Sequence, residues 1–178
     1  MHRIVVVGNS GSGKSTVARV LGEKLEFPVL ELDSIYHQKG WEPLPEEEFR
    51  VKLADFALNQ EWVIDGNYLS SGMKDLVWPV ADTLIWLDLP RRVVMPRIIW
   101  RTLKRGITRE ELWNGNRESL TNLARLDPEL NIIRWSWTRH EHYRQQFEEA
   151  LAGPEVVHLR VVRLRSNAEV RTFLDSSV

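Results

Sequence analysis

The sequence contains no cysteine among its 178 residues. Structural disulfides and thiolate zinc sites are therefore excluded, and nothing favours secretion, so we expect a cytoplasmic protein. No apolar run approaches the roughly 20 residues that span a bilayer, and no early stretch has the pattern of a signal peptide. The formal net charge of −1 gives no overall attraction to nucleic acid or membrane. At this length we expect one core, and one domain over 1–178.

Short β-branched runs alternate with longer helix-like stretches along the chain. The strand candidates lie near 3–7, 28–32, 61–64, 83–88 and 155–162. Such alternation predicts an α/β fold with a parallel sheet. Aspartates end three of these candidates, at positions 33, 65 and 88. Ligands of parallel sheets bind beyond the carboxyl ends of the strands, which makes these carboxylates candidates for chemistry.

A glycine-rich loop follows the first strand candidate and precedes a helix-like stretch. It fits G-x-x-x-x-G-K-[ST] with the residues Gly8, Asn9, Ser10, Gly11, Ser12, Gly13, Lys14, Ser15 and Thr16. Such a loop turns successive backbone N–H groups toward the phosphates of a nucleoside triphosphate, which sit at the positive end of the next helix. Lys14 would bridge the β- and γ-phosphates, and Ser15 would bind Mg²⁺. Kinases, GTPases and ATPases share this loop, so it does not name the reaction.

The metal site needs a carboxylate in addition to Ser15. We predict Asp65 for this role, because the following Gly66 lets the backbone approach a ligand closely. Asp88 is the rival, but Asp88-Leu89-Pro90 has the pattern of a helix start with the aspartate as cap. The structural alternative for either carboxylate is a helix cap or an ion pair with arginine.

Arginines recur every fourth residue in the basic segment 91–109, at positions 97, 101, 105 and 109. On a helix they form a stripe that can grip phosphate oxygens. A solvated basic face and a polyanion-binding patch are the alternatives. Pro96 should kink this helix or begin a new one. Residues 104–131 have the composition of a lid-like insertion over the core.

The acceptor side of the predicted site is less defined. Asp33 could accept a proton from an acceptor hydroxyl, and an N-cap is its equally natural structural role. Trp41 and Trp113 are the better candidates among eight tryptophans for a ligand wall. The stretch 140–142, with two histidines around a glutamate, lacks the spacing of a helical zinc pair and is predicted to be a surface face.

The phosphate loop, Asp65-Gly66 and the arginine stripe together resemble the nucleoside-monophosphate kinase group, which includes the adenylate kinases. More narrowly, the chain is similar to bacterial topology modulation (FlaR-type) proteins. This resemblance rests on the stretches 32–36, 62–68, 133–137 and 163–174, of which the middle two are the more specific. It implies a three-layer P-loop fold with a five-stranded parallel sheet and a mobile helical arginine lid.

The same resemblance implies ATP and Mg²⁺ as donor and cofactor. By the adenylate kinase pattern, Arg97 lies over the adenine, Arg101 lies on the phosphates, and the loop with Arg165 and Ser166 contacts the base. Nothing in the chain matches the adenylate kinase element for the monophosphate. Asp33 and Tyr36 instead resemble a motif of uridine-type kinases, which phosphorylate a hydroxyl. The predicted acceptor contacts are Asp33, Tyr36, Trp41, Asn67, Tyr68 and Arg105.

These observations predict an ATP- and Mg²⁺-dependent small-molecule kinase that acts on a nucleotide, a nucleoside or a similar hydroxyl acceptor. Lys14, Asp33, Arg97 and Arg101 are its expected catalytic residues. Two alternatives remain: an ATP-binding regulatory protein that grips nucleic acid through 91–109, and an ATPase switch linked to a partner. The near-neutral net charge and the lack of a DNA-recognition motif weigh against the nucleic-acid hypothesis.

Overall fold

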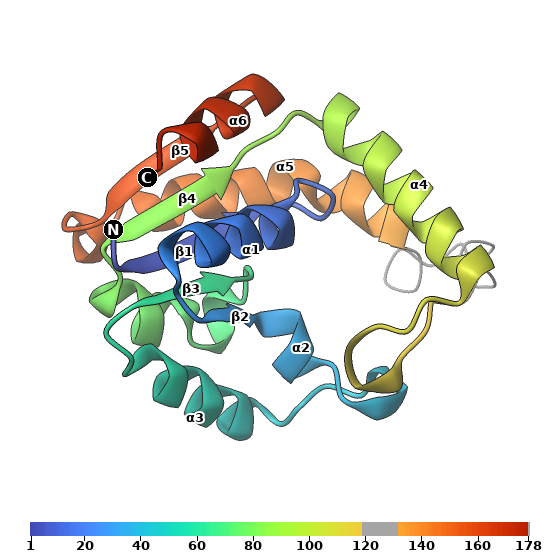
Figure 1. Cartoon of the computed structure of the whole chain (residues 1–178), viewed down its shortest axis with the longest axis horizontal. Coiled ribbons are helices and arrows are strands. Elements are labelled where there is room, and N and C mark those ends of the chain that lie inside the picture. The colour runs from blue at the N-terminus through green and yellow to red at the C-terminus, as the bar shows by residue number, and fades with distance from the viewer. Residues whose placement is uncertain (119–131, 178) are drawn as a thin grey trace.

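The computed structural model describes residues 1–118 and 132–177 and shows an α/β fold (Figure 1). Its strands are β1 (Arg3–Gly8), β2 (Val29–Glu31), β3 (Trp62–Asp65), β4 (Thr83–Leu87) and β5 (Arg160–Leu164). Its helices are α1 (Lys14–Leu25), α2 (Leu32–Tyr36), α3 (Glu46–Ala57), α4 (Arg91–Thr108), α5 (Ile132–Leu151) and α6 (Asn167–Asp175). Short helical turns connect several of them. Within the described ranges, no helix has the length and hydropathy needed to cross a membrane.

The five strands form one parallel sheet in the order β2-β3-β1-β4-β5. Strand β1 is central, and Val5 pairs with Ile64 of β3 and with Leu84 of β4. Because all strands run the same way, their carboxyl ends meet at one edge, where the loop after β1 begins. The expected five-stranded, three-layer P-loop architecture is confirmed.

Alternate residues of β1 point into different cores. Ile4 and Val6 are fully buried in a cluster with residues of α1 and α6. Val5 and Val7 are fully buried in a second cluster, which receives side chains from α3 and α5. The sheet is therefore covered on both faces, which explains why its inner strands are apolar without polar alternation. Figure 1 shows α1 and α6 on one side of the sheet and α5 on the other.

One sequence-based expectation about the elements is wrong, and one of the two alternatives given for Pro96 is excluded. The last strand begins at Arg160, not at 155, because a 3-10 turn at Pro154–Val156 comes first and Arg160 is the residue that pairs with Thr83. Helix α4 neither stops nor restarts at Pro96, and runs as one helix of 18 residues. Proline at this sixth position removes one backbone hydrogen bond. The buried side chains Val94, Met95 and Ile98 hold the helix in place around it.

Candidate active site at the carboxyl edge of the sheet

The loop between β1 and α1 has the backbone of a phosphate cradle. Gly8, Gly11 and Gly13 all have positive φ, with values of 148°, 75° and 96°. A Cβ atom on Gly8 would lie 2.7 Å from the carbonyl oxygen of Leu87, so only glycine fits between the loop and β4. Helix α1 begins directly after Gly13, and the first N–H groups of a helix have no hydrogen-bond partner within the helix. This arrangement is suited to an anion at the helix N-terminus.

Asn67 holds the start of this loop. Its side-chain Oδ1 accepts a hydrogen bond from the Gly8 N–H at 3.0 Å, and its Nδ2 donates to the Gly8 carbonyl at 2.9 Å. The sequence predicts Asn67 as an acceptor contact, but both polar atoms of its amide are used on the phosphate loop. The pairing joins residues 59 positions apart, so no local pattern in the sequence could reveal it.

Asp65 and Ser15 meet beneath the loop. Ser15 Oγ donates to Asp65 Oδ2 at 2.5 Å, and Asp65 is only 5% exposed. Burial raises the pKa of Asp65 from its ordinary value, although Lys14 and the Ser15 hydrogen bond oppose this shift. Its second oxygen, Oδ1, is buried without a hydrogen-bond partner in the described structure. A buried carboxylate oxygen with free lone pairs beside a serine hydroxyl fits a hard divalent cation.

The described residues contain no cluster of three or more histidine, aspartate or glutamate side chains that could hold a metal alone. A cation at Ser15 and Asp65 would therefore complete its shell with phosphate oxygens and water, as Mg²⁺ commonly does. Lys14 is the first residue of α1, and its Nζ lies 3.4 Å from the Asn9 carbonyl oxygen in the loop.

Asp88 is not a helix cap, which corrects the interpretation of its sequence context. Its carboxylate, 2% exposed, accepts hydrogen bonds from Arg144 at 2.9 Å and from Arg163 at 2.7 Å and 2.9 Å. The guanidinium of Arg163 also lies 4.0 Å from the ring centre of Trp86. Helix α4 begins three residues later, at Arg91, with Pro90 as its N-cap. Asp88 thus belongs to a structural ion-pair network, the alternative role that the sequence left open.

Two arginines of α4 contact the phosphate loop. Arg97 lies 3.5 Å from the Ser12 carbonyl oxygen and donates to Asn167 Oδ1 at 2.8 Å. Arg101 donates to Ser10 Oγ at 3.0 Å. Burial and the nearby Arg105 lower the pKa of Arg101, and its Nε has no hydrogen-bond partner in the described structure. These features leave Arg101 poised for an anion.

Fewer arginines of the α4 stripe reach the phosphate loop than their spacing of four residues predicts. Arg105 forms an ion pair with Glu118 at 3.0 Å. Arg109 follows the last residue of α4 in a left-handed conformation, so it does not continue the helix. Arg97 and Arg101 are therefore the members that reach the loop. Of the lid-like segment predicted at 104–131, residues 119–131 lie outside the described residues.

Asp33 lies in α2 rather than at the end of a strand. Its Oδ1 accepts a hydrogen bond from the Tyr68 hydroxyl at 2.7 Å. The N-cap of α2 is Glu31, so Asp33 does not cap this helix. The ring of Tyr36 packs against that of Tyr68, with their centres 4.9 Å apart.

Two asparagines that the sequence analysis did not assign join the loop after α4 to the segment after α2. Asn114 Nδ2 donates to the carbonyls of Ser34 and His37 at 3.1 Å and 2.6 Å. Asn116, 4% exposed, accepts from the N–H groups of Gly40 and Trp41 and donates to the Gln38 carbonyl. We call these contacts the asparagine clasp. The Asn-Gly-Asn sequence marked a turn, but not its partner.

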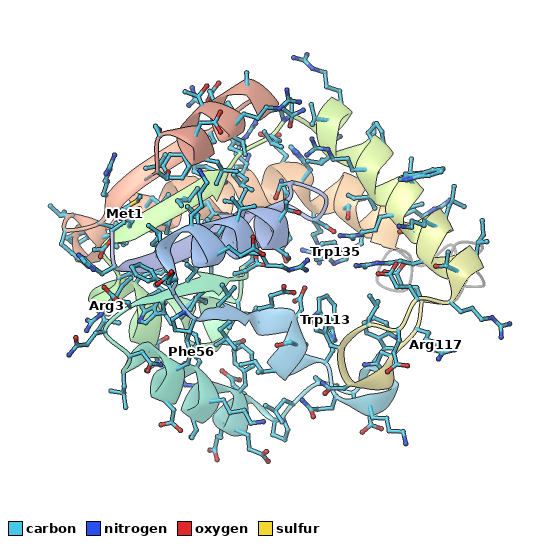
Figure 2. All side chains as sticks on the ribbon, in the orientation of Figure 1. Met1, Arg3, Phe56, Trp113, Arg117 and Trp135 are labelled. Carbon is cyan, nitrogen blue, oxygen red and sulfur yellow. The ribbon has the colours of Figure 1, made fainter. Side chains whose placement is uncertain are left out.

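The predicted tryptophan wall is part of this clasp. Trp41 and Trp113 both pack on His37, with ring centres 5.3 Å and 6.2 Å away. Trp41 has a positive φ of 65°, a conformation that the hydrogen bond from its N–H to Asn116 supports. Figure 2 shows Trp113 beside α2 and Arg117 farther along the same loop.

The loop after β5 lies beside Arg97 through Asn167. Ser166 caps α6 by accepting from the Glu169 N–H, and Glu169 accepts in return from the Arg165 N–H and the Ser166 hydroxyl. This reciprocal pattern resembles a capping box, with the N–H of Arg165 bonded in place of the N–H of the N-cap residue. The Ser166 hydroxyl is used in the cap, so a contact with a base would come from the backbone or from Arg165.

His140 is not on the surface, contrary to expectation. It is 3% exposed, and its Nε2 lies 3.1 Å from the Leu89 carbonyl oxygen. Its own carbonyl accepts from Asn9 Nδ2 at 3.4 Å. His140 therefore joins α5 to the segment before α4 and to the phosphate loop.

No family model matches the chain. Sequence comparison finds a shikimate kinase from Sulfurihydrogenibium sp. (strain YO3AOP1), 29% identical over 111 residues, which cover 55% of this chain and 67% of that protein. A shikimate kinase from Persephonella marina is 28% identical over 137 residues, or 69% of this chain and 79% of that protein. Mouse threonine synthase-like 1 is 43% identical over 108 residues, but these cover only 14% of its length.

Two solved structures share the fold over almost the whole chain. A gluconokinase from Sinorhizobium meliloti 1021 has a TM-score of 0.53 at 18% identity, over 99% of this chain and 89% of that one. A shikimate kinase from Bacteroides thetaiotaomicron has a TM-score of 0.52 at 14% identity, over 98% and 94%. The fold is that of the P-loop kinases. Taken with the sequence relatives and the phosphate loop, it defines a phosphotransferase of the P-loop class.

Proposed function

We propose that this protein transfers the γ-phosphate of ATP to a hydroxyl group of a small molecule, with Mg²⁺ as cofactor. One observation carries the proposal: the phosphate loop, the Ser15–Asp65 pair and Asp33 all lie at the carboxyl edge of one parallel sheet. Phosphoryl transfer depends mainly on positioning and electrostatics, and this edge offers a donor cradle, a metal site and an acceptor carboxylate together.

On the donor side, the backbone N–H groups of the loop and of the first turn of α1 would hold the phosphates. Lys14 would neutralise charge that develops on the transferred group. Arg101, which is half-buried beside Ser10, would contact the phosphates, and Arg97 would lie between the loop and the Arg165–Ser166 turn, on the side of the base. Asn9, Gly11, Gly13 and Thr16 complete the proposed nucleotide site.

Ser15 and Asp65 would hold Mg²⁺. When bound, the ion would supply positive charge that offsets the negative charge of the phosphates. Binding requires Asp65 to be ionised and Ser15 to turn its lone pairs toward the ion. The buried Asp65 Oδ1 has no hydrogen-bond partner in the described structure, so this oxygen is available without breaking another interaction.

On the acceptor side, Asp33 would take the proton of the attacking hydroxyl. The acceptor oxygen bonds to the γ-phosphorus, the bond from that phosphorus to the β–γ bridging oxygen breaks, and ADP leaves with this oxygen. The proton passes to the carboxylate of Asp33. Tyr36, Trp41 and Arg105 are proposed to line the acceptor site, and the asparagine clasp would hold its outer wall.

The identity of the acceptor is the part that the fold leaves open. Four of the proteins named above are a gluconokinase and shikimate kinases, whereas the quoted motifs resemble nucleoside-monophosphate kinases and, more narrowly, topology modulation proteins. The proposal therefore covers nucleotides, nucleosides and small hydroxy acids. It keeps one domain over 1–178 with 104–131 as a lid-like insertion. The nucleic-acid alternative is not favoured, because two arginines of the basic segment, Arg97 and Arg101, are directed at the phosphate loop.

The test is ADP production from Mg·ATP by the purified protein, alone and with nucleoside monophosphates, nucleosides, shikimate and gluconate. We expect acceptor-dependent ADP from one class, and none from Lys14→Ala, because the moving phosphate loses its cation. Lys52→Ala, an exposed lysine of α3, is the matched control and should behave as wild type. ADP release that is equal without any acceptor would instead indicate an ATPase switch, and turnover retained in Lys14→Ala would overturn the site.

A further inference from the structure

Tyr68 follows β3 and the glycine turn at Gly66, and its ring is fixed in an aromatic cluster. The ring centre lies 4.9 Å from that of Tyr36 and 5.1 Å from that of Phe49. Both contacts are tilted arrangements typical of packed aromatic pairs. Phe49 is fully buried, so the cluster is anchored in the core on that face of the sheet. The ring of Tyr68 therefore has little freedom.

The hydroxyl of Tyr68 emerges from this cluster onto Asp33. It donates a hydrogen bond to Oδ1 at 2.7 Å, the usual length for a bond between a hydroxyl and a carboxylate. Burial, with a further contribution from Asp33, raises the pKa of Tyr68 far above its ordinary value. The phenol therefore keeps its proton at every physiological pH and acts as a permanent donor.

The two oxygens of Asp33 are consequently unequal. Oδ1 is held by a rigid donor, and no hydrogen bond to Oδ2 is recorded among the described residues. Asp33 is otherwise exposed on a short helix of five residues, where an aspartate side chain would sample several rotamers. Holding one oxygen of this exposed side chain restricts the position of the other.

We propose that Tyr68 is a positioning residue: it fixes Asp33 through Oδ1 so that Oδ2 receives the proton of the acceptor hydroxyl. This inference rests on the proposed function, and it differs from the sequence-based prediction that Tyr68 contacts the acceptor itself. A positioning role affects the rate of the chemical step, whereas a direct contact affects acceptor binding. The two roles therefore leave different kinetic signatures.

The experiment compares Tyr68→Phe with wild type by steady-state kinetics on the intact protein. The control is Tyr143→Phe, which removes the same atom from a half-buried tyrosine that packs on Trp135. We expect kcat to fall about tenfold in Tyr68→Phe, as for the loss of one positioning contact, while the KM values for ATP and acceptor stay within about twofold. Thermal melting and titration of ATP-binding sites correct kcat for any misfolded fraction.

A rise in acceptor KM with unchanged kcat would overturn the proposal in favour of direct contact, and so would wild-type values for both. The variants Asp33→Ala and Asp33→Ala/Tyr68→Phe add an independent check. If Tyr68 acts through Asp33, the second substitution should leave the residual rate of the first unchanged, because coupled residues are not additive. A full tenfold further loss would contradict it. Normal turnover in Asp33→Ala would overturn the proposed role of Asp33, and no acceptor-dependent turnover in wild type would overturn both proposals.

Discussion

Replacing Asn67 by alanine should weaken the binding of ATP rather than the binding of the acceptor. The side-chain amide of Asn67 makes two hydrogen bonds to the backbone of Gly8, at 3.0 Å and 2.9 Å. Gly8 is buried where β1 passes into the phosphate loop, so water cannot easily replace the lost partner. The substitution thus releases the loop at the point where its direction is set.

The size of the effect follows from the two bonds. Each contributes about 1 kcal/mol net, so the native loop loses about 2 kcal/mol of stabilisation. If the free loop relaxes and ATP must restore its shape, this loss corresponds to a roughly 30-fold increase in the Kd for Mg·ATP. If the loop keeps its shape, the same loss lowers the free energy of unfolding instead. The two losses should therefore sum to about 2 kcal/mol.

The assay is calorimetric titration of Mg·ATP together with urea unfolding of the ligand-free protein. Asn59→Ala is the matched control, because it removes an exposed asparagine whose side chain, among the described residues, bonds to the nearby Phe56 carbonyl alone. Unchanged Kd and unchanged stability would refute the reasoning. An increase in acceptor KM with normal ATP binding would show instead that Asn67 contacts the acceptor, as the sequence predicts.

Two further predictions concern the metal carboxylate and the clasp. Burial raises the pKa of Asp65, so its ionisation costs stability as pH rises through the native-state pKa. Asp65→Asn should therefore abolish turnover yet raise the free energy of unfolding at pH 7. This gain should vanish below about pH 4, where the carboxyl group is protonated in both the folded and the unfolded state. Urea unfolding at both pH values checks this, and a variant less stable than wild type at pH 7 would contradict it. Asn116→Ala removes the three hydrogen bonds of the buried Asn116 side chain and should speed hydrogen exchange of the Gly40 amide at least about tenfold. Unchanged protection of the Gly40 amide would show that the asparagine clasp does not hold the segment after α2.

The sequence predicted the fold where local pattern decides the structure. The apolar runs at β1, β3 and β4 are buried on both faces, and the loop after β1 carries its own turn chemistry. The start of the last strand was predicted too early. The apolar residues of the preceding turn lead directly into the strand, and only pairing with β4 shows that the strand begins at Arg160. The order of the strands has no counterpart in local pattern.

The candidate site divides in the same way. The phosphate loop and the Ser15–Asp65 pair could be predicted, because strand-end position and residue type point to the same chemistry. The partners of Asn67 and Asp88 could not, because they lie 59 and 56 or more positions away in the chain. Only the folded structure shows that the Asn67 amide supports the phosphate loop and that the Asp88 carboxylate pairs with two arginines.

The turn from Asp65 to Tyr68 has a consequence for how this sequence can change in evolution. Asp65 bonds to Ser15, Asn67 to Gly8 and Tyr68 to Asp33, while a side chain on Gly66 would lie 2.8 Å from Leu32. Four neighbouring positions therefore depend on four different partners. In close homologues, a substitution at one of these positions should occur together with a substitution at its partner. Correlated substitutions would therefore identify the pairs of residues that contact each other in the site.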